Sequence, residues 1–189
     1  MTSLETYIQS YFKIPTENVS DVASLFEEEE LKKGDFFARE DTYCQKMSFQ
    51  TSGLLRVFKN VGDKEITQWI NTEGHFITEL PSFMFGQRAR FQIQALSDSK
   101  LYTISRKGYL QLSTLIPQWP ELEKQFLSAC FITLEDRVFS HLSMSAEERY
   151  DLLFEKNKAL FNQVPLQYIA SMLGMTPETF SRIRSKRIS

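Results

Sequence analysis

The chain is poor in the residues that hold metals and redox groups. Its 189 residues include only two cysteines and two histidines, and none of these four lies near another. Without a CxxC motif, four thiolates for an iron–sulfur cluster are not available within one chain. Cys44 and Cys130 are therefore predicted to be ordinary buried thiols in a reducing compartment. We expect neither a bound metal nor a cofactor.

Long apolar runs are also missing. No uninterrupted apolar stretch approaches the roughly 20 residues that a membrane-spanning helix needs. No basic and apolar leader opens the chain. The composition, with 42% apolar and 24% charged residues, is that of a globular protein with one large or two small domains. These features predict a soluble, cytoplasmic protein that does not bind a membrane.

The first segments of the chain are predicted to be helical. Apolar residues recur at helical spacing in residues 4–12, and a second short helix is predicted for residues 20–26, capped by Ser20 or Asp21. The run Glu27–Glu30 follows. Its carboxylates are not spaced to converge on one point, so it is predicted to be a solvated rim and not a metal site.

From residue 31 to 104 the apolar period changes to two. Residues 54–59 and 65–70 are rich in β-formers and flank a turn-like connection at residues 60–64, which predicts a hairpin. Further alternating runs and regularly placed glycines fill the rest of this region. Its length accommodates about eight strands of typical size. The pattern predicts a sandwich or a barrel-like β-roll.

The second half of the chain is helical. Ser105 is predicted to cap a short helix that ends near Ile116, and a long helix is predicted from Trp119 to His141. One row on this helix steps by three or four residues and comprises Leu127, Phe131, Leu134, Val138 and Leu142. A second row comprises Leu122, Phe126, Ala129 and Cys130. Spacing near 3.5 favours pairing with a second copy of the helix, and the alternative is a helix buried on both sides within one domain.

A capping box at Ser145 and Glu148 opens the next predicted helix, over residues 149–161. The predicted domain boundary therefore lies at Met144/Ser145. The pattern divides the chain into a β-roll domain with flanking helices at residues 1–118, a long linker helix at residues 119–143 and a small helical domain at residues 144–189.

The last segment has the layout of two short helices joined by a sharp turn. Ile169, Ala170 and Leu173 form an apolar inner face, and Gly174 accepts a left-handed turn. Thr176 is a natural N-cap with Pro177 at the first helical position, and Phe180 and Ile183 point inward. Residues 163–189 carry four basic residues and one acidic residue, whereas the whole chain has a net charge of −2. A basic tip on an acidic body is the electrostatic signature of DNA binding.

This order of elements resembles the Crp/Fnr family of bacterial transcription regulators, the family of the catabolite activator protein. The most specific match is the run from Ile169 to Ile183, which is similar to the family's I-[AG]-x-x-[LV]-G-x-[ST]-x-E-[TS]-[VFL]-x-R signature. The resemblance implies an α+β fold: an N-terminal β-roll like the cyclic nucleotide-binding domain (a double-stranded β-helix), a long dimerisation helix, and a C-terminal helix-turn-helix domain. It covers nearly the full length.

By this resemblance, Glu178 and Arg182 read bases, and Thr176 and Thr179 contact phosphates. Pro177 departs from the pattern where some members carry a base-contacting arginine, so the recognised DNA sequence is expected to differ. The chain ends soon after the recognition helix, and phosphate contacts of a β-wing are expected to be absent or supplied by basic residues near the end. The residues expected to form the DNA interface are Thr176, Pro177, Glu178, Thr179, Arg182 and Lys186, with Arg187 as a further phosphate contact.

The effector cassette of cyclic AMP-binding members is matched only in part. Glu79 corresponds to the ribose-binding glutamate, but Ala89 stands where the phosphate-binding arginine should lie. Arg88 and Arg90 flank that position, and a shift of one residue along a strand sends a side chain to the opposite face. A loop shift that brings one of them to an anion stays open, as does an exposed, purely structural role. Residues Glu79, Phe83, Arg88 and Arg90 are the candidate effector contacts, and the effector is predicted not to be cyclic AMP.

The resulting hypothesis is a homodimer that binds double-stranded DNA at a pseudo-palindromic operator, with an unidentified small-molecule effector and RNA polymerase as a further partner. One alternative is a protein that only senses a small molecule and whose helical domain does not bind DNA. Another is a regulator that responds to a cyclic nucleotide. An enzyme of the cupin type is disfavoured because no histidine pair with a carboxylate lies on adjacent strands. The chain is therefore predicted not to be an enzyme.

Overall fold

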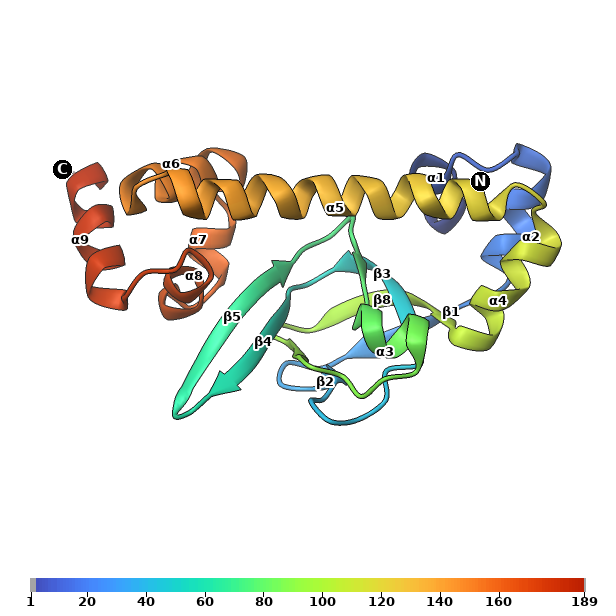
Figure 1. The fold of residues 1–189 in the computed structure, drawn as a ribbon, viewed down its shortest axis with the longest axis horizontal. Coiled ribbons are helices and arrows are strands. Elements are labelled where there is room, and N and C mark those ends of the chain that lie inside the picture. The colour runs from blue at the N-terminus through green and yellow to red at the C-terminus, as the bar shows by residue number, and fades with distance from the viewer. Residues whose placement is uncertain (1–2, 189) are drawn as a thin grey trace. The chain divides into compact units, whose positions relative to one another are not determined.

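The computed structural model describes residues 3–188 and has an α+β fold (Figure 1). The first part contains the helical segments α1 (Ser3–Phe12), η1 (Thr16–Asn18) and α2 (Val19–Ala23). The strands that follow are β1 (Phe26–Leu31), β2 (Phe36–Ala38), β3 (Lys46–Ser52), β4 (Leu55–Val61), β5 (Lys64–Asn71), β6 (Phe76–Ile77), β7 (Gln92–Ala95) and β8 (Ser99–Ser105), with α3 (Leu80–Phe85) between β6 and β7. The remaining helices are α4 (Arg106–Leu115), α5 (Trp119–Ser143), α6 (Ala146–Lys156), α7 (Leu160–Gln163), α8 (Leu166–Met172) and α9 (Pro177–Ile188).

The strands form two four-stranded sheets, in the orders β1-β8-β3-β6 and β2-β7-β4-β5. Neighbouring strands of the first sheet are antiparallel, with Phe26 opposite Ile104 and Ser48 opposite Thr103. Eight strands in the described part of the chain confirm the predicted β-roll.

The β region begins earlier than predicted. The helix expected to run to Phe26 ends at Ala23, and it starts at Val19 after Asn18 instead of being capped by Ser20 or Asp21. Phe26 instead opens β1, because it and Leu31 are buried while β8 supplies the hydrogen-bonding partner. The glutamates at 27–30 thus lie on a strand at the edge of the first sheet, three of them exposed and Glu29 half-buried. Residues 3–188 contain no cluster of acidic, histidine or cysteine side chains suited to a metal.

The predicted hairpin is present, with a tighter turn than expected. Strand β4 continues to Val61 and β5 starts at Lys64, so only Gly62 and Asp63 remain between them, not residues 60–64. Gly62 has φ of +59°, a value that a two-residue hairpin turn requires and that glycine adopts without steric cost.

Helices pack against the first sheet to form the main apolar core. Fully buried side chains from α1, α4 and the start of α5 meet there, among them Ile8, Leu112 and Trp119. Phe12 lies between the rings of Trp119 and Phe126, with centroid distances of 5.0 and 5.1 Å. The first turns of α5 are therefore part of the core, and Leu122 and Phe126 of the second predicted row pack against it.

Both predicted helices after the β-roll are confirmed. Ser105 caps α4 by accepting a hydrogen bond from the backbone N–H of Gly108 at 3.1 Å. Helix α5 spans 25 residues from Trp119 to Ser143. No helix within residues 3–188 is both long and apolar enough to cross a membrane.

Contacts divide the chain into two compact units. The roll unit comprises the chain up to Val57 and Asn71–Cys130, and the helical unit comprises Phe58–Ile70 and the chain from Phe131 onward. The hairpin of β4 and β5 therefore groups with the C-terminal helices, an arrangement that the patterns had not suggested. The division at residues 1–118, 119–143 and 144–189 stays a prediction.

The helical unit corrects one predicted helix. In place of a single helix over residues 149–161, α6 ends at Lys156 and α7 starts at Leu160. Asn157 breaks the helix because its side-chain oxygen accepts from the backbone N–H of Leu160 at 3.2 Å, a local bond that competes with helix continuation. The break brings the ring of Phe161 against Phe180, with centroids 6.0 Å apart.

The cysteines are both free thiols, but only one of them is buried. Cys44 is inside the roll unit, whereas Cys130 is exposed, contrary to the expectation of two buried thiols. Cys130 lies on α5 one turn beyond Phe126, which packs against the core.

Candidate DNA-binding and effector sites

The helix-turn-helix is formed by α8 and α9. Ile169 and Ala170 are completely buried at the contact of the two helices. Gly174 has φ of +68°, and the backbone N–H of Met175 donates to the carbonyl of Ala170 at 3.0 Å, which closes the turn. The hydroxyl of Thr176 then accepts from the backbone N–H of Thr179 at 3.2 Å and caps α9. The local structure is the one that the sequence predicts.

The face of α9 opposite its core side is open to solvent. Phe180 and Ile183 are 0% and 2% exposed and anchor the helix, whereas Glu178 and Arg182 are exposed. Hydrogen bonding to its own backbone N–H and to the Thr176 side chain lowers the pKa of the Glu178 carboxyl. An ionised acceptor thus stands at the N-terminus of α9, one turn before a guanidinium.

The remaining members of the predicted DNA interface differ in their surroundings. Pro177 is exposed, and Thr179 is half-buried beside Thr176. Lys186 is exposed but forms an ion pair with Glu147 of α6 at 3.0 Å. The structure therefore pairs Lys186 with Glu147, a residue that the sequence analysis had not connected to it.

A second ion pair holds the end of α9. The Arg187 guanidinium donates two hydrogen bonds to Asp151, at 2.9 and 2.5 Å. These bonds lower the pKa of the Asp151 carboxyl, and the ammonium of Lys186 likewise lowers the pKa of Glu147. Both terminal cations are thus paired with α6, while Arg182 forms no ion pair with any residue in the described range.

Glu79, the first candidate effector contact, is a helix cap. Its side chain accepts from the backbone N–H of Ser82 at 3.0 Å and so opens α3. The other carboxylate oxygen accepts from the backbone N–H of Arg90 at 3.2 Å and lies 3.6 Å from that residue's Nε. The Glu79 side chain is 3% exposed, and its two oxygens are occupied by groups of the protein.

The two candidate arginines lie in different environments. Arg88 donates to the carbonyl of Asp41 at 2.6 Å and lies over the Tyr43 ring. The side chain of Arg90 is 61% exposed. Between them Ala89 is buried, and its N–H donates to the carbonyl of Thr42 at 2.8 Å. The structure therefore joins Arg90 to Glu79 and leaves Arg88 apart, on the Asp41 loop.

Phe83 is 1% exposed and belongs to the core, where its ring meets Tyr109 edge-on at 5.0 Å. It also borders a pocket of about 170 Å³ that sequence reasoning missed. The hydroxyl of Tyr109 donates to Glu123 at this pocket, and burial raises the pKa of Tyr109. The pocket is lined by Phe83, Met84, Arg106, Tyr109, Leu110, Ser113, Trp119 and Glu123.

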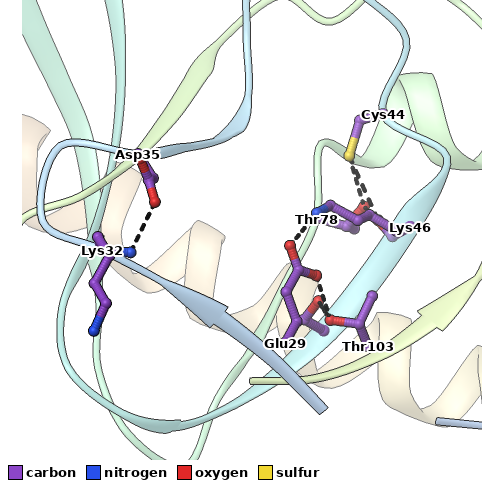
Figure 2. A network of polar contacts seen from close by, with 8 residues as sticks. Glu29, Lys32, Asp35, Cys44, Lys46, Thr78 and Thr103 are labelled. Atoms are coloured by element: carbon purple, nitrogen blue, oxygen red, sulfur yellow. Dashed lines mark hydrogen bonds and ion pairs between the residues drawn. The ribbon is translucent and has the colours of Figure 1, made fainter. Parts of the chain in front are cut away.

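A polar network crosses the first sheet (Figure 2). Glu29 of β1 pairs with Lys46 of β3 and accepts from the Thr103 hydroxyl of β8 at 2.7 Å. The backbone carbonyl of Lys46 accepts from Thr78 at 2.8 Å and from the thiol of Cys44 at 3.4 Å. The sequence signal for this network is the alternation along β1, which turns Glu28 and Glu30 away from the sheet interior and Glu29 towards it. These bonds tie three strands together and account for the half-buried glutamate.

Comparison with known proteins identifies families and solved structures that are similar to this chain. Residues 28–114 match the family model of the cyclic nucleotide-binding domain. No curated protein sequence matches the chain. Among solved structures, FixK2 from Bradyrhizobium japonicum is 19% identical, with 85% of this chain and 83% of that one covered and a TM-score of 0.72.

Two further structures extend the likeness. CLP from Xanthomonas campestris, a c-di-GMP-responsive global regulator, is 14% identical with 91% of each chain covered and a TM-score of 0.70. A protein from Eubacterium rectale assigned to the Crp/Fnr family of transcriptional regulators is 16% identical, with 97% of this chain and 88% of that one covered and a TM-score of 0.71. Residues 28–114 are thus similar to cyclic nucleotide-binding domains, and the chain has the fold of these solved regulator structures.

Proposed function

We propose that this chain, which combines a cyclic nucleotide-binding domain with the Crp/Fnr fold, is a homodimeric, DNA-binding transcription regulator controlled by an effector in its β-roll. The observation that carries the proposal is the solvent-exposed pair Glu178 and Arg182 on one face of α9. The proposed interface on DNA comprises Thr176, Pro177, Glu178, Thr179, Arg182 and Lys186. The protein acts as a binding switch and not as an enzyme.

The chemistry of that pair suits base reading. Arginine donates two hydrogen bonds to O6 and N7 of guanine, and glutamate accepts from N4 of cytosine. Glu178 and Arg182 are four residues apart, so both face the same side of α9. Thr176 and Thr179 lie at the helix N-terminus, where hydroxyls and the backbone amides favour a phosphate.

Dimerisation is supported by the apolar side chains on the second half of α5. Phe131 is 59% exposed and Val138 is 52% exposed, although both are large and apolar. Leu134 and Leu142 extend the same row, with 50% and 81% exposure. A row of this spacing is covered when two copies of the helix pair in parallel. Two copies of α9 then read successive major grooves about 34 Å apart on a pseudo-palindromic operator.

The proposed effector is not cyclic AMP. Both oxygens of Glu79 are already bonded within the protein, and Ala89 occupies the position of the phosphate-binding arginine. Arg90 is the candidate that lies beside Glu79, with most of its side chain open to an anion. Arg88 and Phe83 remain candidate contacts if the loop after α3 rearranges. The effector shifts the populations of two states of the dimer and so changes its affinity for DNA.

A second candidate function is favoured by the ion pairs at the end of α9. Lys186 and Arg187 are paired with acidic residues of α6, which leaves fewer cations for phosphates. In that case the chain is a sensor of a small molecule whose helical unit contacts another protein.

Selection of DNA from a random pool separates the two functions. We expect the wild-type protein to enrich a pseudo-palindromic sequence, and the variant Arg182→Ala to lose preference at one base pair of each half-site. The variant Arg184→Ala, on the same helix, is the matched control for removal of a positive charge. Failure of the wild-type protein to enrich any sequence contradicts the regulator and favours the sensor.

A further inference from the structure

Two arginines outside the helix-turn-helix donate hydrogen bonds to the backbone of its turn. Arg137 of α5 donates to the carbonyl of Met172 at 3.1 Å, and Arg149 of α6 donates to the carbonyl of Leu173 at 3.0 Å. These carbonyls belong to the last turn of α8, where a helix has no internal donors and where positive charge is favourable. The turn that orients α9 is therefore fixed by guanidinium groups outside the motif.

The same turn sits against α5. A Cβ atom built on Gly174 would lie 3.5 Å from Cδ2 of His141, so the turn lies close to the end of α5 and has room for no more than a methyl group there. His141 in turn is bonded through Nδ1 to the carbonyl of Arg137 at 2.9 Å. Arg137 and His141, one turn apart on α5, thus meet the end of α8 together.

The β4–β5 hairpin also contacts α8 and Arg137. The backbone N–H of Thr67 in β5 donates to the Ser171 hydroxyl of α8 at 2.9 Å. The Arg137 guanidinium lies 5.1 Å from the ring centroid of Trp69, also in β5. All these residues belong to the helical unit, whereas the first residues of β4, up to Val57, and the last residue of β5, Asn71, belong to the roll unit.

Arg137 is suited to link the β4–β5 hairpin to the turn after α8, because its guanidinium can use its flat face and its N–H edge at the same time. The face contacts the Trp69 ring while an edge N–H donates to Met172, a combination that an ammonium cannot reproduce. The side chain is half-buried, and burial lowers its pKa. The ring and the carbonyl compensate part of the cost of removing the charge from water.

We propose that Arg137 is a positioning residue for DNA binding, which links the β4–β5 hairpin to the turn before α9 so that the state of the hairpin sets the orientation of the recognition helix. This inference rests on the proposed function. A change that loosens the hairpin then also loosens the turn, and the reverse holds as well. Arg137 does not touch DNA in this role and acts through Met172.

Hydrogen exchange tests the link without DNA. We expect Arg137→Met to accelerate exchange of amides in both the hairpin at residues 58–70 and the turn at residues 172–176 by about tenfold, with β8 unchanged. The matched control is Lys158→Met, which removes a cation 5.6 Å from the Phe154 ring in the same unit without contacting hairpin or turn. Arg137→Lys keeps the charge and is expected to behave like Arg137→Met, because the flat face is lost. Acceleration in only one of the two segments, or equally in β8, contradicts the link.

DNA binding tests the consequence. With a duplex that the wild-type protein selects from a random pool, Arg137→Met is expected to lower the affinity about tenfold, while binding to an unrelated duplex changes less than about twofold. Equal affinity of variant and wild type for the selected duplex overturns the positioning role. If the wild-type protein selects no duplex, the proposed function fails, and the exchange experiment still decides whether Arg137 joins the hairpin to the turn.

Discussion

Two glutamates at the start of two helices have opposite surroundings in this protein. Glu79 caps α3, is 3% exposed on its side chain and binds the N–H groups of Ser82 and Arg90. Glu178 lies in the first turn of α9 and is exposed, and its pKa is lowered by its own backbone N–H and by Thr176. The same residue type near a helix N-terminus therefore organises the protein in one region and is available to an external partner in the other.

The largest effects are expected from the aromatic anchors of the two regions. Phe83→Ala in the roll unit and Phe180→Ala in the helical unit each remove a fully buried ring and should each lower the free energy of unfolding by about 3–5 kcal/mol. Hydrogen exchange then shows whether each loss stays within its own unit. Faster exchange in both units after either change contradicts two separately stable regions.

Removing the carboxylates tests the comparison directly. Glu79→Ala leaves the buried N–H of Ser82 and the part-buried N–H of Arg90 without their acceptor and is expected to cost about 1–3 kcal/mol of stability. Glu178→Ala removes no buried contact and should stay within about 0.5 kcal/mol of wild type. Urea unfolding monitored by circular dichroism measures both. An equal loss of unfolding free energy in the two variants would show that the two glutamates do not differ in this way.

Arg182→Ala and Arg90→Ala compare the exposed cations of the two regions. Arg182→Ala is expected to cost about 1–3 kcal/mol of specific DNA binding and to relax preference at one base pair. Arg90→Ala should leave the DNA affinity of the effector-free protein unchanged. Fluorescence anisotropy with a selected duplex measures both, and a comparable loss for Arg90→Ala contradicts the assignment of DNA binding to α9.

The smallest effect concerns pH and the end of α9. The Asp151 carboxyl has a lower pKa in the folded protein than in the unfolded chain, because Arg187 donates to it. Its contribution to stability is therefore present above the unfolded pKa and is lost as the pH falls through the folded pKa. Asp151→Asn should lower the urea midpoint slightly at pH 7 and not at a pH below the folded pKa. The same difference at both values excludes the ion pair as its cause.

Local patterns were sufficient for the helix-turn-helix. Its spacing of apolar residues, the left-handed Gly174 and the Thr176 cap are each determined within one or two turns of chain, and the structure has all three. The capping box of Ser145 and Glu148 is confirmed for the same reason. The roles of the base-contacting residues stay a prediction, since exposure permits contact with DNA and does not demonstrate it.

Errors arose where a distant partner outweighed the local pattern. The helix expected over residues 20–26 ends at Ala23, and Phe26 belongs to β1 instead, because β8 offers it a hydrogen-bonding edge. The ion pairs of Lys186 and Arg187 depend on how α6 packs beside α9, which no sequence spacing reports. Glu79 matched a family cassette in position, yet its two oxygens are satisfied by Ser82 and Arg90, the latter from beyond α3.

The order of residues alone was enough to specify the β-roll, the long α5 and the turn between α8 and α9, because periodicity, caps and glycines act over a few residues. Folding in three dimensions settled which charges are paired and which stay open, and it grouped the β4–β5 hairpin with the C-terminal helices. Those outcomes depend on contacts between side chains that are far apart in the sequence. Burial and ion pairing arise only from such contacts.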